Sequence, residues 1–265
     1  MRRVDGVAAG AGAGPAPGYR RASAVIVISD FPRAAMKPVA AGMVESVRLD
    51  HVSYAVDVDS FPSTVSRLGS LLGAPFSDGG LHPRFGTRNA ILPLSGGSYV
   101  EVVTPLDHPA TDSAPFGQAV KRRAALGGGW LGWVVGVDDL TPFEARLGRD
   151  AKPATRCRPD GTRLEWRQIG ILELIDDPQL PYLIQWCVGA DLHPSAGASG
   201  QIGIDRLEIS GARGEVLEWL GTKDEDPLPQ VHVNWLAPAD VENAYDEAGL
   251  VAVDFHTAHG MVRID

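Results

Sequence analysis

The chain has 265 residues, of which 44% are hydrophobic, and this is enough for a globular protein with a substantial core. Its formal net charge of -9 at pH 7 argues against nucleic acid or a membrane surface as the main partner, because both select clustered Lys and Arg. Cys157 and Cys187 give no disulfide framework and no CxxC zinc motif, and no apolar run is long enough to span a membrane. We therefore expect a cytoplasmic protein.

Residues 1–43 differ in composition from everything that follows. The tract "GVAAGAGAGPAPG" is rich in Ala, Gly and Pro and has no hydrophobic period. Such a segment buries too little apolar surface to offset chain entropy, so it predicts a disordered N-terminal extension. Met43 directly precedes the first convincing strand, and we hypothesise that it is the natural start.

The first regular element is predicted at residues 48–56, "RLDHVSYAV". Apolar and other residues alternate there, which is typical of a strand with Val52, Tyr54 and Val56 on one face and His51 and Ser53 on the other. A helix is predicted next, over residues 60–73, because apolar residues recur at helical spacing between a serine and a glycine.

A polar stretch follows this helix and leads into further strands. The stretch "GGLHPRFGTRNAILPL", residues 79–94, crowds hydrogen-bonding groups around a Phe-Gly-Thr turn and is predicted as a loop that enters a strand at 89–94. Another strand is predicted at 98–106. The unit is therefore a strand, a helix and then two or three strands.

The same order of elements returns further along the chain. Residues 130–189 again read as a strand, a short helix and three strands, and residues 200–265 begin a third such series. We therefore expect an α+β protein with a two-module domain over 44–190, whose modules span 48–106 and 130–190. A partial module at 200–265 is expected to pack on it.

Four segments of the first module resemble the vicinal oxygen chelate superfamily and, within it, the glyoxalase-like domain proteins. They are "LDHVSYAVDVDSF" at 49–61, "LGSLLGAPF" at 68–76, "GLHPRFGTRNAILPL" at 80–94 and "SYVEVVTP" at 98–105. The resemblance implies paired βαβββ modules of the glyoxalase and bleomycin-resistance type, curved around a cavity for a small molecule. It also implies a bacterial protein, pairing of two copies as a homodimer, and a lyase, isomerase or dioxygenase reaction on an oxygenated organic substrate.

The resemblance also implies a divalent-metal site for Zn, Fe, Mn or Ni, with a first-strand His and a last-strand Glu as ligands. In this sequence those residues are His51 and Glu101. The second module has Trp133 and Ile184 at the matching positions, so only two ligands remain where catalytic zinc usually has three. His51 is thus a metal ligand, a hydrogen-bonding cavity residue or a structural histidine. No glycine-rich fingerprint indicates a nucleotide cofactor.

Glu101 lies on an otherwise apolar strand. A buried carboxylate without a partner is costly, so it must meet a metal, an arginine or water in a cavity. We expect Glu101 to act as a general base or metal ligand with His51 as its partner.

The polar stretch supplies the expected substrate-binding rim. Its members are His82, Arg84, Thr87, Arg88 and Asn89. Guanidinium donors form a planar fork that suits carboxylate or carbonyl oxygens, which favours an orienting role. The alternative is that Arg88 or Asn89 pairs with Glu101 or with loop carbonyls.

The second module is expected to contribute Trp133, Gln185 and Trp186 to the cavity wall, with Trp166 on a neighbouring strand. Aromatic walls suit a hydrophobic small ligand, although core packing explains tryptophans equally well. Because Trp133 and Ile184 replace the expected ligands, a non-catalytic protein that binds and sequesters a drug or antibiotic is the alternative function.

Overall fold

The computed structural model describes residues 47–198, 200–237 and 248–265. The expected N-terminal extension and the hypothesised start at Met43 lie outside the described residues. No helix in the described ranges is long and apolar enough to cross a membrane.

The first module has the order strand, helix, three strands. Its elements are β1 (Arg48–Ala55), α1 (Phe61–Leu72), β2 (Ser77–His82), β3 (Thr87–Pro93) and β4 (Tyr99–Pro105). Helix α1 has proline in its first turn and ends at Gly73, whose left-handed backbone lets its N–H bond the carbonyl of Gly69. It buries Leu68 and Leu72 as the helical spacing predicts.

The second module repeats this order. Its elements are β5 (Gly129–Gly136), α4 (Thr141–Leu147), β6 (Lys152–Cys157), β7 (Arg163–Ile169), the single turn α5 (Glu173–Asp176) and β8 (Tyr182–Trp186). In each module the first strand pairs with the last in parallel, β1 with β4 and β5 with β8. The predicted class, α+β with paired βαβββ modules of the glyoxalase type, is confirmed.

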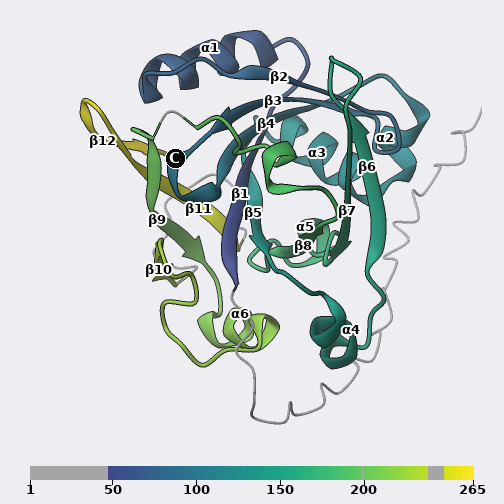
Figure 1. The fold of residues 1–265 in the computed structure, drawn as a ribbon, viewed down its shortest axis with the longest axis vertical. Coiled ribbons are helices and arrows are strands. Elements are labelled where there is room, and N and C mark those ends of the chain that lie inside the picture. Colours follow the sequence, from purple (N-terminus) through teal and green to yellow (C-terminus); the bar gives the residue numbers. More distant parts are fainter. Residues whose placement is uncertain (1–46, 199, 238–247) are drawn as a thin grey trace, which may run out of the picture. The chain divides into compact units, whose positions relative to one another are not determined.

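Eight strands close into a barrel in the order β1-β4-β3-β2-β6-β7-β8-β5 (Figure 1). Two antiparallel seams join the modules. One is the long ladder between β1 and β5, and the other is a short contact between β2 and β6, where Leu81 pairs with Cys157. The interior of the barrel is therefore built from both modules.

Two helices between the modules were not predicted from the sequence. They are α2 (Pro109–Ser113) and α3 (Pro115–Ala125), and each has proline in its first turn. Helix α3 packs on β4 and β5 with Phe116, Ala119 and Val120 buried. Their burial closes one side of the barrel with apolar surface.

The C-terminal segment forms a second sheet. Its elements are β9 (Gly203–Ser210), α6 (Arg213–Leu220), β10 (His232–Leu236), β11 (Gly249–Thr257) and β12 (Gly260–Ile264), and the sheet order is β10-β9-β11-β12. The segment begins strand-helix-strand like the modules, but its first strand lies between β10 and β11. This strand order differs from that of the two modules.

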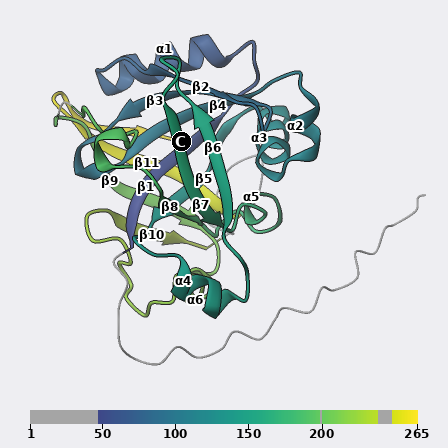
Figure 2. The same cartoon turned by 45° about the vertical axis from the view of Figure 1, so that its right-hand side comes forward.

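Three side-chain contacts fasten this sheet to the second module. The Trp130 indole donates to the carbonyl oxygen of Ile264 at 2.9 Å, and the Trp219 indole donates to that of Pro181 at 2.8 Å. Arg146 of α4 donates to the carbonyl of Glu218 at 2.7 Å, and both views show α4 beside α6 (Figure 2). These contacts bring side-chain donors to backbone carbonyls across the boundary between the two parts.

Candidate functional site

A cavity inside the barrel gathers buried polar groups and aromatic rings from both modules. The cavity is partly open to solvent. The lining residues are His51, His82, Phe85, Asn89, Tyr99, Glu101, Phe116, Arg156, Trp166, Gln168, Ile171, Tyr182, Ile184 and Trp186. Few polar groups within an apolar wall are typical of a small-molecule site.

The polar stretch of the sequence folds as a hairpin rather than a loop. Strands β2 and β3 are joined by a turn in which the Gly86 N–H bonds the carbonyl of His82, and Gly86 has a φ of 64°. The turn places His82 opposite Thr87, and the His82 Nδ1 lies 3.0 Å from the Thr87 hydroxyl. Both side chains are buried.

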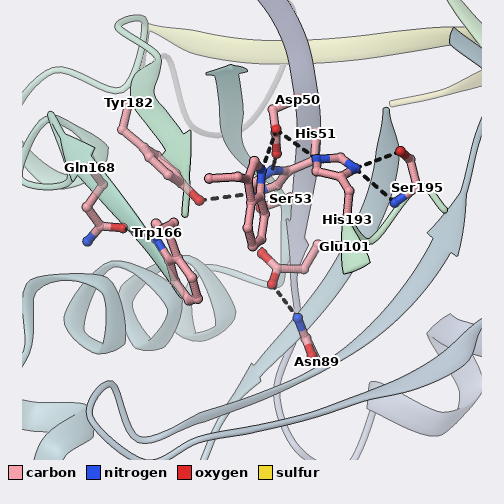
Figure 3. Close-up of polar contacts among 11 residues, drawn as sticks. Asp50, His51, Ser53, Asn89, Glu101, Trp166, Gln168, Tyr182, His193 and Ser195 are labelled. Carbon is pink, nitrogen blue, oxygen red and sulfur yellow. Dashed lines mark hydrogen bonds and ion pairs between the residues drawn. The ribbon is translucent and has the colours of Figure 1, made fainter. Parts of the chain in front are cut away.

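Asp50, which the sequence did not single out, anchors a network behind the cavity. Its carboxylate accepts hydrogen bonds from His51 Nδ1 at 2.7 Å, from the Trp186 indole at 2.8 Å and from His193 Nε2 at 3.1 Å (Figure 3). Burial raises the pKa of Asp50, but the hydrogen bonds from His193 and His51 outweigh it and hold the pKa well below its ordinary value. Asp50 is therefore a buried carboxylate at neutral pH.

His51 lies between this carboxylate and the cavity. With Nδ1–H donated to Asp50, its Nε2 accepts the hydroxyl proton of Tyr182 at 3.0 Å. The ring stacks on Tyr99 with centroids 4.4 Å apart. Burial, with the charges of Asp50 and Glu101, raises the pKa of both tyrosines well above 10, so they remain phenols.

Glu101 of β4 is buried and faces the same cavity. One carboxylate oxygen accepts the Ser53 hydroxyl at 2.7 Å and the other accepts the Asn89 amide at 2.6 Å. Burial raises the pKa of Glu101, but the neighbouring imidazoles of His51 and His82 and these hydrogen bonds bring it below its ordinary value. The group is ionised at neutral pH and has lone pairs to spare for a ligand.

Arg156 of β6 brings a buried guanidinium to the cavity wall. Its Nη1 donates to two uncharged oxygens, the carbonyl of Gly79 and the side-chain oxygen of Asn89. Burial lowers the pKa of Arg156 below its ordinary value, as desolvation of a cation must. Asn89 thereby bridges Arg156 to Glu101.

Five expected site residues belong to the cavity wall: His51, His82, Asn89, Glu101 and Trp186. Thr87 lies behind the wall and holds His82. The contact between Asn89 and Glu101 is the pairing that the sequence left open as an alternative to substrate binding.

Four expected substrate-binding residues lie outside the cavity lining, because the fold gives each another environment. Arg84 is exposed in the hairpin turn, and Arg88 forms an exposed ion pair with Asp78. Trp133 is fully buried in the core, and its indole donates to a backbone carbonyl. The side chain of Gln185 is hydrogen-bonded to backbone groups just before α4.

Several cavity residues were missed in the sequence, namely Phe85, Tyr99, Phe116, Arg156, Gln168 and Tyr182. Tyr99 shares a strand face with Glu101, and this period-two relation could have found it. Arg156 gave no local signal, because its place depends on the pairing of β6 with β2.

A family model described as a glyoxalase-like domain matches residues 49–255, most of the chain. The chain belongs to the glyoxalase-like domain family. Its membership confirms the resemblance to the vicinal oxygen chelate superfamily. No curated protein matches this glyoxalase-like chain significantly.

Solved structures share the fold at low sequence identity. A hypothetical protein from Staphylococcus aureus is 15% identical with a TM-score of 0.53, and the match covers 83% of this chain and 86% of that one. Methylmalonyl-CoA epimerase from Mycobacterium tuberculosis is 18% identical with a TM-score of 0.36, over 56% of this chain and 91% of that one. The first of these matches shows that the glyoxalase-like chain shares its fold with that protein.

The side chains of this glyoxalase-like cavity do not fit the metal site that the superfamily implies. Both nitrogens of His51 and both oxygens of Glu101 are already hydrogen-bonded within the protein. In the described part of the chain, no group of three or more His, Cys, Asp or Glu side chains could hold a metal ion. Glu101 keeps lone pairs for a ligand, but both nitrogens of His51 are in use, so the two expected ligands fall short of the number that a divalent metal needs.

Proposed function

We propose that this protein is a glyoxalase-like enzyme that moves a proton on a small oxygenated organic molecule bound in the barrel cavity. Glu101 is the general base. The observation that carries this proposal is a buried, ionised carboxylate facing a cavity that is walled mainly by aromatic, aliphatic and uncharged polar groups, with Arg156 as its one guanidinium. A base needs this setting because exclusion of water strengthens its interaction with a substrate proton.

The neighbours of Glu101 support a catalytic role because they hold it without neutralising it. Ser53 and Asn89 each occupy one lone pair of the carboxylate and fix its orientation. His51 is held by Asp50 on one side and Tyr182 on the other, so it keeps its tautomer beside the base. In this assignment His51 supports the proton transfer and Tyr182 presents a phenol to the substrate.

The test follows proton exchange rather than a named product. Carbonyl compounds with an acidic α-hydrogen, such as 2-oxo acids, hydroxyketones and thioesters, are incubated with the protein in D2O and followed by proton NMR. Wild type is expected to exchange the α-hydrogen of at least one class, and Glu101→Gln is expected to slow that exchange about 100- to 10,000-fold. Exchange that Glu101→Gln leaves intact would exclude Glu101 as the base.

Glu165→Gln is the matched control. Glu165 lies on β7 of the same barrel, and its half-exposed side chain pairs with Arg163 on the outside. The same chemical change there should leave exchange at the wild-type rate. Equal losses in both variants would indicate a general loss of folded protein.

Sequestration of a hydrophobic compound is the second candidate. It is favoured by the aromatic rings that line the cavity. The ring centroids of Trp166 and Trp186 lie 5.5 Å apart, and those of Phe85 and Phe116 lie 5.6 Å apart. This function predicts ligand binding that Glu101→Gln leaves within a few-fold, with no exchange or turnover in wild type. A cytoplasmic location belongs to either proposal and agrees with two exposed free cysteines.

A further inference from the structure

His82 and Arg156 face each other across the seam between the two modules. The antiparallel pairing of Leu81 with Cys157 puts the next residue of β2, His82, opposite the preceding residue of β6, Arg156. Leu81 and Cys157 are exposed, so alternation turns His82 and Arg156 inward, where both line the cavity. One module thus supplies the imidazole and the other the guanidinium.

The Nε2 of His82 is a buried polar atom that has no hydrogen-bond partner among the residues that the structure describes. Burial lowers the pKa of His82 to about 4, so the ring is neutral at pH 7. When the Thr87 hydroxyl donates to Nδ1, the single ring proton lies on Nε2 and can be donated to a ligand. An orphaned donor at the wall of a cavity indicates that a ligand oxygen satisfies it.

Arg156 also has donors to offer. A guanidinium carries five N–H groups, and among the described residues only its Nη1 has hydrogen-bond partners, Gly79 and Asn89. Both Arg156 and His82 line the cavity, and the charge of Arg156 acts on the His82 ring. Two neighbouring donors, one of them cationic, suit an oxygen atom that gains negative charge.

The charged groups around the cavity favour a ligand whose oxygen is uncharged when it binds. Glu101 is an ionised carboxylate in the cavity wall, and Asp50 is another directly behind it. A carboxylate ligand would place a further negative charge beside Glu101 in a largely buried site, which is costly. An uncharged carbonyl compound adds none.

We propose that His82 and Arg156 form an oxyanion site for an uncharged, enolisable carbonyl substrate. Glu101 takes the hydrogen on the carbon next to the carbonyl. The C–H electron pair forms a carbon–carbon double bond, and the carbonyl electrons move onto the oxygen, which accepts hydrogen bonds from His82 Nε2 and Arg156. The charge lost by Glu101 appears on this oxygen, so the net charge of the site does not change.

This inference rests on the proposed proton transfer and names the substrate class for it. It also gives the cavity a means of stabilising an enolate with its own side chains. The donors come from opposite modules, so the oxyanion site exists only when the barrel closes between β2 and β6.

Benzohydroxamic acid and benzoate are the probes that test it. Benzohydroxamic acid is uncharged at pH 7 and can give a proton to Glu101 and leave an oxyanion, whereas benzoate arrives charged; both have a ring for the aromatic wall. Protein treated with a chelator is titrated with each, and tryptophan fluorescence is followed. We expect benzohydroxamic acid to bind at least 10-fold more tightly than benzoate. Benzoate binding as tight or tighter would overturn the proposal.

Variants then assign the donors. Arg156→Met and His82→Asn are each expected to weaken the binding of benzohydroxamic acid about 10- to 100-fold. Arg156→Lys keeps the charge and should weaken binding less than Arg156→Met does. Arg163→Met, an exposed arginine on β7, should leave affinity unchanged. Melting temperatures identify any variant that fails to fold, and the wild-type comparison of the two probes does not depend on them.

The two proposals fail in different ways. If wild type exchanges α-hydrogens and needs Glu101, but both donor variants keep wild-type affinity and exchange rate, the oxyanion site is wrong and the proton transfer stands. If exchange survives Glu101→Gln, the proposed base is wrong whatever the probes show.

Discussion

The carboxylate of Asp50 bonds the imidazole of His51 at 2.7 Å, although the two residues are adjacent in one strand. Neighbours in a regular strand point to opposite faces. Here the pairing of β1 with β5 shifts between Leu49 and His51, so Asp50 is the extra residue of a β-bulge. The bulge brings a second polar side chain of β1 to the site and explains how Asp50 reaches His51.

The first prediction concerns the substitution Asp50→Asn. The substitution removes the charged acceptor of His51, His193 and Trp186. The new side-chain NH2 group would face N–H groups that need an acceptor. The free energy of unfolding should fall by about 2–4 kcal/mol in urea denaturation. Asp138→Asn is the control, because Asp138 is 77% exposed and its change should stay under about 0.5 kcal/mol. An unchanged midpoint for Asp50→Asn would show that the network adds no stability.

The second prediction is a loss of stability in mild acid that depends on His82. Its pKa is about 4 in the folded protein against 6.5 for a free imidazole, so the unfolded chain binds the proton more tightly. The contribution of the neutral ring to the free energy of unfolding is therefore fully present above pH 6.5. It is lost as the pH falls from 6.5 through 4. It amounts to about 3 kcal/mol.

Urea denaturation at a series of pH values measures this contribution. His82→Phe removes the titrating group and keeps an apolar ring, so wild type should lose about 3 kcal/mol more than the variant between pH 7 and pH 4. Parallel pH profiles for the two proteins would assign the acid sensitivity to other groups.

Local periodicity predicted the elements whose burial pattern repeats along the chain. The strand at β1, the helix α1 and the repeat of the module follow from apolar spacing alone. Helix α3 was missed because Pro115 and Gly117 lie at its start and its buried residues are mostly small, such as Ala119 and Ala124. Its position depends on the barrel that it covers.

The site residues also divide into those that local sequence predicts and those that depend on strand pairing. Glu101 could be found because it is a polar residue within an apolar strand sequence, and His82 because it lies in a stretch crowded with hydrogen-bonding groups. Asp50 could not, because strict alternation put it on the opposite face from His51 until the bulge moved it. Arg156 could not either, because only the closure of β6 against β2 brings it to the cavity. Non-local pairing leaves no short-range signal in a sequence.

The third prediction tests how the C-terminal sheet is fastened. The Trp130 indole is buried and donates to the carbonyl of Ile264 in β12. Trp130→Phe keeps a smaller aromatic ring and removes the indole donor to that carbonyl, so the free energy of unfolding should fall by about 1–2 kcal/mol. The control Trp235→Phe removes a longer, exposed contact to Glu225 and should change little. If both variants lose the same free energy of unfolding in urea denaturation, the buried hydrogen bond of Trp130 contributes no more than the exposed one of Trp235.

The last prediction concerns Gly79, whose backbone conformation suits any residue but whose surroundings do not. A methyl group there would overlap the side-chain oxygen of Asn89 and come within 2.8 Å of the Ile91 side chain. Asn89 holds Arg156 and Glu101 together, so Gly79→Ala should displace that bridge. We expect a loss of about 1–3 kcal/mol in stability and weaker binding of benzohydroxamic acid.

Gly214→Ala is the matched control for this change. Gly214 lies in α6 with no atom near the added methyl, so alanine there should be neutral or stabilise by up to about 1 kcal/mol. Calorimetry and the fluorescence titration measure both variants. If Gly79→Ala keeps wild-type stability and affinity, Asn89 can move without cost, and the bridge between Arg156 and Glu101 does not hold the two charges in place.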